Sequence, residues 1–504
     1  MKNEIKAGAM IGYINMFLNI IIALLYTPFM LKLMGESEYG LYSLIVSIIS
    51  YLSILDLGFG NAMIRFVSRS QARKDNNEQK INGIFLFLYT IIGGIALIIG
   101  IIISSNVNLI FQDSLNNQEL QKAKILVLIL VFNVALSFPL SVFDSYIIAN
   151  EKYKYSKLMT LFKNVTKPLL MTPLLLLGYK SISMTIVTAA LNIFFHFLML
   201  FYCLKFLKMK IHFSIKNIDK KLLKEIWTYS FFIFLNIIVD SVFNNTDQII
   251  LGIVIGTSAV AVYSIAYQII QMNTMCSTVI SGLFLPKVTK ILEEKNSNEE
   301  VSSLFIKVSR IQIYIMMLIF FGFVIFGKNF IKLWVGANYL DAYHIILIII
   351  GPSIVPLTQN IGISIIQAKN MHQFRAVVYI LIAVINVAIS IPLAKLYGGI
   401  GTAIGTAIAN ICGQIITMNI FYYKVIKLDI PKYWNFFLKM FIEYGIMSLI
   451  IKYIISNFNN NVIIYILEII LFCLLYCIIT FINLNKNERI FFKGITNKVL
   501  RRKV

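Results

Sequence analysis

The stretch INGIFLFLYTIIGGIALIIGIII, residues 81–103, carries no charged side chain. A helix needs about 20 mostly apolar residues to cross the hydrocarbon core of a bilayer, and this stretch is long enough. The rest of the 504-residue chain has the same character, because 59% of its residues are hydrophobic and only 13% are charged. Globular proteins have about 25% charged residues. With a mean hydropathy of +0.81, the sequence predicts an all-α integral membrane protein.

About fourteen stretches of the chain are long and apolar enough to span a membrane as helices. We expect kinks near Pro139, Pro352 and Pro356, because proline inside a helix removes a backbone hydrogen bond. The predicted spans cover residues 8–32, 40–63, 81–103, 124–149, 156–178, 182–204, 227–252, 259–285, 304–327, 342–368, 374–395, 399–423, 433–455 and 461–484.

The positions of Lys and Arg predict how the chain is oriented, because cytoplasmic connectors carry an excess of both residues. If the N-terminus lies inside, most of the 45 Lys and Arg fall in inner segments. Both termini are therefore expected in the cytoplasm. The formal net charge of +22 then describes a solvated inner face rather than a nucleic-acid site. The outer connectors hold Lys32, Lys122, Lys124, Lys180, Lys328, Lys332, Lys395 and Lys452.

No pattern in the sequence is typical of an enzyme or of a metal site. The outer connectors are too short for a catalytic domain outside the membrane. The five cysteines lie in apolar runs, and the four histidines are scattered without the spacing of metal ligands. The first apolar run is too long for a cleavable signal peptide. We therefore expect neither an enzyme nor a bound metal or cofactor.

Two pairs of stretches resemble each other at nearly the same separation along the chain. LMGESEYGLYSLIVSI (33–48) resembles VIGTSAVAVYSIAYQI (254–269), and SMTIVTAALNI (183–193) resembles GTAIGTAIANI (401–411). The first pair aligns two tyrosines, Tyr42 and Tyr263, which we interpret as packing or interfacial residues. Similarity at a fixed separation indicates an internal repeat.

The separation equals six predicted spans, so both repeats enter the membrane in the same direction. Parallel repeats of this kind are related by a two-fold axis along the membrane normal. We expect a six-helix bundle over residues 1–210 and a second over 211–425. Residues 426–504 would add two transmembrane helices and a basic cytoplasmic tail. In such transporters the substrate binds between the bundles near the midplane, and rocking gives alternating access.

Five motifs resemble polysaccharide flippases of the Wzx type, in the superfamily that also holds the MATE multidrug exporters. The resemblance implies a substrate of undecaprenyl diphosphate carrying an oligosaccharide repeat, moved from the inner to the outer leaflet of the bacterial cytoplasmic membrane. It implies a role in capsule, O-antigen or exopolysaccharide assembly, with a polymerase and a chain-length regulator as partners. The motifs are DLGFGNAMIRF (56–66), IIANEKYKYS (147–156), DQIILGIVIGTSAVAVYSIAYQI (247–269), LFLPKVTKI (283–291) and GGIGTAIGTAIAN (398–410).

Cationic residues within the apolar spans are candidates for binding this substrate. A charge near the bilayer centre costs about 2.5–3.5 kcal/mol on insertion scales, so each suggests a function. Lys163 and Lys167 share one face of the predicted span 156–178, and Lys167 lies about 16 Å into it. We predict a cationic surface for the diphosphate, with Arg65 and Asp144 as further cavity residues. Alternatively, Lys163 pairs with Asp144 or extends toward the cytoplasm, and Lys167 pairs with another aspartate.

Acidic residues within the spans are candidates for coupling transport to an ion. Asp240 is a candidate proton or sodium site or else a paired structural charge. Asp247 follows the polar run Asn244–Thr246, which we expect to mark the outer opening. Asp56 lies about 12 Å from the inner end of the second span. It either couples an ion, fixes the inner ends of helices or touches the substrate.

The sequence also bears on three other functions. A MATE-like drug or cation antiporter usually has twelve spans and often an acidic residue in its first span, which is absent here. A lipid II flippase has a similar number of spans but carries basic cavity residues in its first helix, and these are absent too. A polysaccharide polymerase or ligase usually has a large outer loop, whereas the outer connectors here are short.

Overall fold

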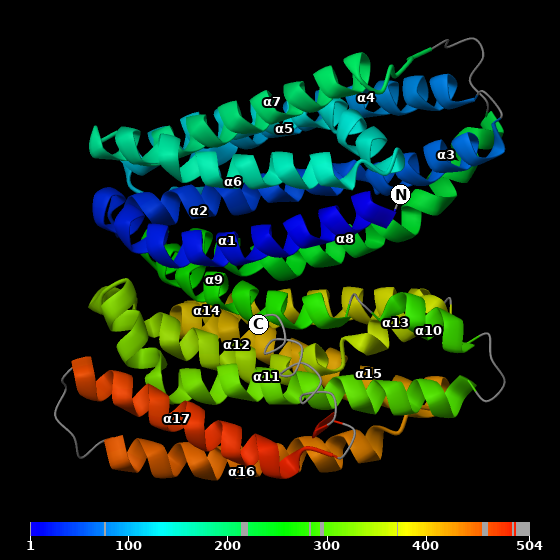
Figure 1. Ribbon diagram of the computed structural model, residues 1–504. Coiled ribbons are helices and arrows are strands. Elements are labelled where there is room, and N and C mark those ends of the chain that lie inside the picture. Colours follow the sequence, from blue (N-terminus) through cyan, green and yellow to red (C-terminus); the bar gives the residue numbers. More distant parts are fainter. Residues whose placement is uncertain are drawn as a thin grey trace, which may run out of the picture. The chain divides into compact units, whose positions relative to one another are not determined.

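The structure is a computed structural model, and it describes residues 2–74, 77–212, 220–281, 284–292, 297–369, 371–455, 462–485 and 488–489. Within these residues it contains helices and no strands (Figure 1). The predicted all-α fold is therefore confirmed. Most of the basic tail falls outside the described residues.

The N-terminal helices are α1 (Lys2–Met34), α2 (Glu36–Ser50), η1 (Tyr51–Asp56), α3 (Phe59–Arg73), α4 (Glu78–Phe111), α5 (Asn117–Ala149), α6 (Tyr153–Leu176), α7 (Lys180–Lys205) and α8 (Lys220–Val254).

The C-terminal helices complete the order. They are α9 (Thr257–Ser281), α10 (Leu285–Leu292), α11 (Ser297–Trp334), η3 (Ala337–Tyr339), α12 (Asp341–Thr358), α13 (Ile361–Ala368), α14 (His372–Asn410), η4 (Ile411–Thr417), α15 (Met418–Phe421), η5 (Tyr422–Ile426), α16 (Ile430–Ile455) and α17 (Val462–Asn483).

The described part of the chain has ten helices long and apolar enough to cross a membrane. One of them runs over Gln373–Ile426 and covers two predicted spans, 374–395 and 399–423. The two spans meet at Gly398, whose φ of 59° interrupts α14. The helices α6, α9 and α16 lie on three further predicted spans. A multi-pass membrane protein is confirmed, and the count of about fourteen spans stays a prediction.

The expected effect of proline differs between two helices. In α12 the helix ends at Thr358, two residues after Pro356, and α13 begins at Ile361. In α5 the helix continues through Pro139 to Ala149. Proline removes a hydrogen bond to the carbonyl four residues earlier, which in α5 is that of Ala135. The neighbouring α4 approaches this carbonyl closely at Gly93, where a Cβ would lie 2.5 Å from the Ala135 oxygen.

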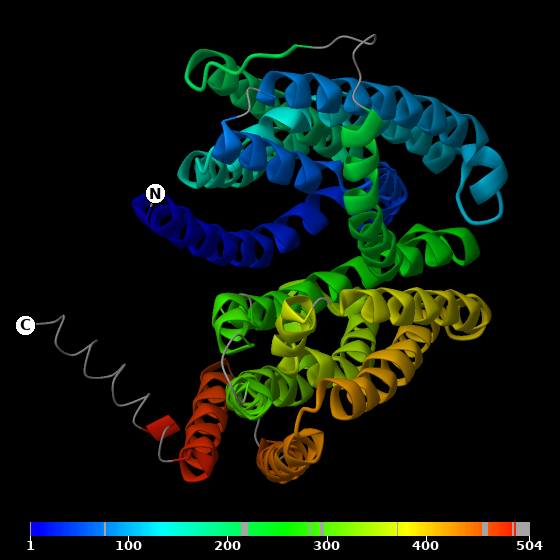
Figure 2. The same ribbon diagram turned by 90° about the vertical axis from the view of Figure 1, so that its right-hand side faces the viewer.

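The helices group into two compact units. Unit 1 contains Met1–Tyr267 and Ala376–Ala409, and unit 2 contains Gln268–Arg375 and Asn410–Val504. These units do not coincide with the predicted bundles over 1–210 and 211–425, whose division stays a prediction. In unit 1 the pairs α4–α5, α5–α7 and α1–α6 pack along each other, and in unit 2 α11 packs against α12 and α16. Figures 1 and 2 show α16 and α17 side by side in unit 2.

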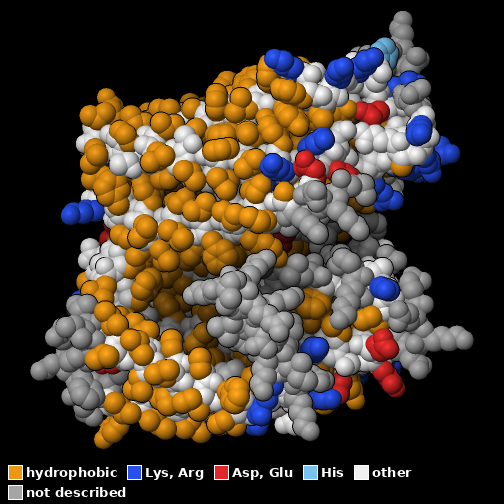
Figure 3. Space-filling model, viewed as in Figure 1, with side chains coloured by type: hydrophobic (Ala, Val, Ile, Leu, Met, Phe, Trp, Pro, Cys, Tyr) orange, Lys and Arg blue, Asp and Glu red, His pale blue; other side chains and the backbone are white. Residues whose placement is uncertain are grey.

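The surface of unit 1 agrees with a helix bundle in lipid. Large apolar side chains are exposed along its helices, including Leu97, Ile98 and Ile102 on α4. On the face drawn in Figure 3, most of the visible Lys and Arg of the unit gather at the end where α3 lies, and apolar side chains cover most of the rest of its helices. This is the end that the sequence places in the cytoplasm.

Candidate transport and coupling sites

The two lysines of α6 are partly buried and have no ion pair or hydrogen bond in the described part of the chain. Lys163 and Lys167 lie one helical turn apart, as the sequence predicts. Lys163 is close enough to Lys167 and to Asp144 to interact electrostatically with both. The expected ion pair between Lys163 and Asp144 is not formed among the described contacts. Between the lysines, Asn164 donates a hydrogen bond of 3.0 Å to Asn15 of α1, which fixes α6 against α1.

Asp144 has a partner that the sequence analysis missed. Its Oδ2 lies 3.2 Å from Nδ1 of His196, which α7 brings beside α5. Its other oxygen, Oδ1, is buried and accepts no hydrogen bond from any described residue. His196, rather than Lys163, is therefore the close partner of Asp144 among the described residues. The two residues lie at similar depths in the predicted spans 124–149 and 182–204, and that common depth is the signal that could have revealed the pair.

The carboxylate of Asp56 has partners in one side chain and in the backbone. Tyr89 of α4 donates a hydrogen bond of 2.6 Å to its Oδ1, and the backbone N–H groups of Gly58 and Gly60 are close enough to interact with the carboxylate electrostatically. Asp56 thus lies at the N-terminus of α3, where backbone N–H groups lack helical partners. The turn before α3 is tight, with φ of 51° at Leu57 and 77° at Gly58. This geometry fixes a helix end.

Arg65 lies apart from the α6 lysines on the exposed face of α3. Its guanidinium carbon is 4.3 Å from the ring centroid of Tyr229 on α8. One turn later, Nη1 of Arg69 lies 3.1 Å from Oε2 of Glu225, also on α8. These contacts join α3 to α8. The role of Arg65 in a cavity therefore stays a prediction. Its observed contact is the one with Tyr229, which connects α3 to α8.

Asp247 lies at the centre of a buried polar cluster made by three helices. The residue, which the sequence predicts near an outer opening, is only 3% exposed. Its Oδ2 accepts hydrogen bonds of 2.5 Å from Tyr263 of α9 and 2.7 Å from Thr406 of α14. Ser390 of α14 is also within hydrogen-bonding reach. Tyr263, interpreted from the sequence as a packing residue, is a hydrogen-bond donor here.

The Asp247 cluster has polar atoms without partners. Oδ1 of Asp247 and Nδ2 of Asn386 are buried, and neither has a hydrogen bond within the described residues. Oδ1 of Asn386 accepts hydrogen bonds of 2.7 Å from Ser390 and 3.3 Å from Thr406. The oxygen atoms of the cluster come from one carboxylate, three hydroxyl groups and one amide. Such a set fits a proton or a hard monovalent cation.

Asp240 is not part of this cluster. It lies about two helical turns before Asp247 on α8, and its side chain is exposed. The structure therefore separates the two acidic residues that the sequence predicts as coupling sites. Of these two residues, Asp247 is the buried one, and its Oδ1 has no hydrogen-bond donor among the described residues.

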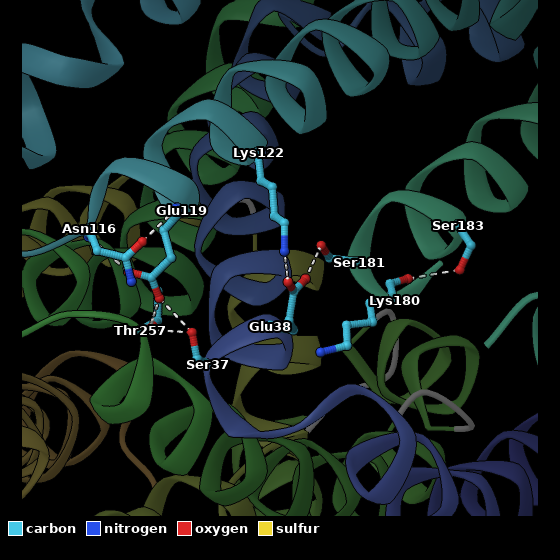
Figure 4. A network of polar contacts seen from close by, with 9 residues as sticks. All are labelled: Ser37, Glu38, Asn116, Glu119, Lys122, Lys180, Ser181, Ser183 and Thr257. Atoms are coloured by element: carbon cyan, nitrogen blue, oxygen red, sulfur yellow. Dashed lines mark hydrogen bonds and ion pairs between the residues drawn. The ribbon is translucent and has the colours of Figure 1, made fainter. Parts of the chain in front are cut away.

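A second polar network, which the sequence analysis did not predict, lies where α2, α5, α7 and α9 begin (Figure 4). Glu38 of α2 accepts hydrogen bonds from Lys122 of α5 and from Ser181 of α7, the latter at 2.5 Å. Glu119 of α5 accepts from Ser37 at 2.5 Å and from Thr257 of α9 at 2.8 Å. The network therefore ties these helix ends together. The predicted orientation places it on the outer side.

Comparison with known proteins adds evidence of descent. The chain is 21% identical over 406 residues to a putative O-antigen transporter of Shigella flexneri, over 79% of this chain and 92% of that protein. It is 22% identical over 200 residues to a probable low-salt glycan biosynthesis flippase of Haloferax volcanii. That match covers 40% of this chain and 42% of the relative, so it spans less than half of the relative's length.

Two solved structures share the fold. A lipid II flippase in an inward closed conformation matches with a TM-score of 0.74 and 20% identity, over 96% of this chain and 99% of that one. An inward-facing multidrug resistance transporter of the MATE family matches with a TM-score of 0.59 and 13% identity, over 81% and 96%. The family model described as polysaccharide biosynthesis protein matches residues 6–292. That match covers more than half of the chain, so the chain belongs to the polysaccharide biosynthesis protein family.

Proposed function

We propose that this protein moves an oligosaccharide linked to undecaprenyl diphosphate from the inner to the outer leaflet of the bacterial cytoplasmic membrane. Its family and the flippases and transporters among its relatives support this function. The repeat would serve assembly of a capsule, an O-antigen or an exopolysaccharide, and the protein would act as a transporter without a catalytic step. A polymerase and a chain-length regulator would act on the product.

The observation that carries the proposal is the pair of α6 lysines. The cargo has a diphosphate and sugars that cannot cross hydrocarbon, whereas its lipid tail can remain in the bilayer. Lys163 and Lys167 are partly buried and have no acidic partner within 4.0 Å among the described residues. A charge kept in a membrane span without a partner is costly. Both ammonium groups therefore remain available to an anionic substrate.

The contacts of α2 with α8 and α9 support alternating access. Ser47 and Tyr51 are hydrogen-bonded to Gln248 and Thr246 of α8. A Cβ on Gly40 would lie only 1.9 Å from the carbonyl oxygen of Thr257. These helices belong to different predicted repeats, and this packed seam would have to separate in another state of the transport cycle.

We propose Asp247 as the residue that couples this cycle to a proton or a sodium ion. Its Oδ1 has no hydrogen-bond donor in the described structure, and hydroxyl groups of Tyr263 and Thr406 hold Oδ2. Because the three residues come from α8, α9 and α14, neutralising the carboxylate would change the contacts among three helices. Asp56 is a weaker candidate because its Oδ1 already accepts a hydrogen bond from Tyr89 and the backbone of Gly58 and Gly60 interacts with the carboxylate.

Deleting the gene and analysing membrane lipids tests the proposed function. The expected result is loss of a surface polysaccharide and accumulation of its single repeat on undecaprenyl diphosphate in the inner leaflet. Accumulation of lipid II instead would make lipid II the cargo. Unchanged lipids with increased sensitivity to cationic drugs would contradict the flippase and favour an antiporter.

Complementation of the deletion strain tests the α6 lysines. At matched expression, Lys167→Ala should reduce surface polysaccharide at least about tenfold, because it removes a charge from a partly desolvated site. Lys167→Arg should retain most of it. Lys157→Ala, which changes an exposed lysine of the same helix, is the matched control. Full polysaccharide in the Lys167→Ala strain would remove this residue from the site.

A further inference from the structure

A large cavity opens in unit 2, and its lining includes neither the α6 lysines nor any residue of the Asp247 cluster. Its volume is about 1070 Å³, and it lies among the start of α11, the helix η5 with the turn after it, the start of α16 and the residues that follow α17. Four lysines line it, Lys307, Lys424, Lys427 and Lys432. Their side chains are exposed, and none of the four has an ion pair in the described part of the chain.

The cavity has an excess of positive charge. Arg310 also lines it, but its Nε lies 2.7 Å from Oε1 of Glu488 and its Nη2 lies 3.0 Å from Oε2. This buried pair is neutral as a whole. The remaining acidic groups of the lining are Glu299 and Asp429, which only partly offset the four lysines.

The length of α11 places the cavity at the level of lipid headgroups. The helix has 38 residues, so it is about 57 Å long, whereas the hydrocarbon core is about 30 Å thick. Its apolar part is the predicted span 304–327, and the cavity-lining residues begin at Asn298. The predicted orientation puts this end in the cytoplasm, where the membrane surface is anionic.

The rim of the cavity also suits a lipid. Tyr423 lines it and is 55% exposed, as expected for an amphipathic ring at a membrane interface. Ile306, Leu428 and Phe436 add apolar surface. The helix η5, which carries Tyr423 and Lys424, is a π-helix, a rare geometry that is frequent at functional sites. A soluble anion would use the lysines alone, whereas a phospholipid would use the lysines and the apolar wall.

We propose that this cavity binds the phosphodiester headgroup of an anionic phospholipid from the inner leaflet. The lysines from η5, the following turn and α16 hold the phosphate, together with Lys307 of α11. The acyl chains lie along the apolar surface of α16, where Leu438, Ile442 and Ile446 are exposed. The bound lipid connects α11 to the C-terminal pair of helices.

Native mass spectrometry of the full-length protein in detergent tests this site. The probes are phosphatidylglycerol and zwitterionic phosphatidylcholine. Wild type should bind phosphatidylglycerol in preference. The triple variant Lys424→Gln, Lys427→Gln, Lys432→Gln should bind it at least about tenfold more weakly. The same three positions changed to Arg should retain binding. The matched control changes three exposed lysines of unit 1 to Gln, at Lys208, Lys210 and Lys224.

Four outcomes would overturn the proposal. They are equal binding of the two lipids, undiminished phosphatidylglycerol binding by the Gln variant, equal loss in the control variant, and loss in the Arg variant. A separate measurement adds excess inorganic phosphate to the lipid complex. Retention of phosphatidylglycerol supports a lipid site, whereas its displacement identifies a site for soluble anions. A thermal unfolding midpoint for the Gln variant equal to that of wild type confirms that any loss of binding is local.

Discussion

At the residue scale, the aspartates within the apolar spans differ in how their oxygens are satisfied. Oδ1 of Asp56 accepts a hydrogen bond from Tyr89. Asp144 faces His196 with Oδ2, and its Oδ1 has no donor among the described residues. Asp247 is held at Oδ2 by two hydroxyl groups, and its Oδ1 has no donor there either. A buried polar group without a partner is costly, so it is retained where it has a function. Asp247 is buried, whereas the side chain of Asp144 is 30% exposed, and Asp247 is therefore the residue to test.

Replacing Asp247 with Asn should lower transport about tenfold while keeping the size of the side chain, because the coupling free energy between sites is typically 1–3 kcal/mol. The measurement is surface polysaccharide in the deletion strain, with lipid-linked repeat as the second readout. Asp240→Asn is the control on the same helix, since that side chain is exposed, and it should retain transport. Full activity of Asp247→Asn with loss in Asp240→Asn would reverse the assignment.

At the element scale, close packing of helices depends on where glycine lies. Gly93 faces the carbonyl of Ala135 on α5, whereas Gly94, its neighbour on α4, has open space around its missing Cβ. Two adjacent residues therefore offer a contact position and a free position. The missing Cβ of Gly93 lets α4 approach the Ala135 carbonyl, which Pro139 leaves without its helical hydrogen bond.

Gly93→Ala should lower the free energy of unfolding by about 1–3 kcal/mol, the usual cost of overpacking. Its Cβ would lie 2.5 Å from backbone oxygen, so one helix must shift. Gly94→Ala should be neutral or slightly stabilising, because alanine favours a helix. Thermal unfolding of both purified variants in detergent measures the difference. Equal midpoints would show that α4 and α5 are packed less closely at this position.

At the scale of the whole molecule, orientation rests on the distribution of charge. The two ends of α7 provide a direct test, since Tyr179 precedes the helix, Lys210 follows it, and both are exposed. In spheroplasts, a membrane-impermeant maleimide should label Tyr179→Cys. It should leave Lys210→Cys unlabelled until the membrane is made permeable. Labelling of the parent protein measures the signal from its native cysteines, which is subtracted. The reverse labelling pattern would contradict the predicted topology.

Apolar length and charge distribution were enough to predict a helical multi-pass membrane protein from the sequence alone. Both are properties of single segments, because each span must satisfy its own backbone in lipid. The i, i+4 lysines of α6 were found for the same reason, since their spacing is local. The motifs that carry the family resemblance were also local; the family match over residues 6–292 confirms the family and covers four of the five motifs.

Tertiary structure decided which polar side chains meet. His196 and Asp144 lie on different helices, and so do Asp247, Tyr263 and Thr406. A single span shows that a polar residue is present and roughly how deep it lies, but not which neighbour it faces. That choice depends on the rotation and pairing of helices, which packing determines. The sequence by itself thus determined the helices and the membrane, and only the packed structure decided the partners of their buried charges.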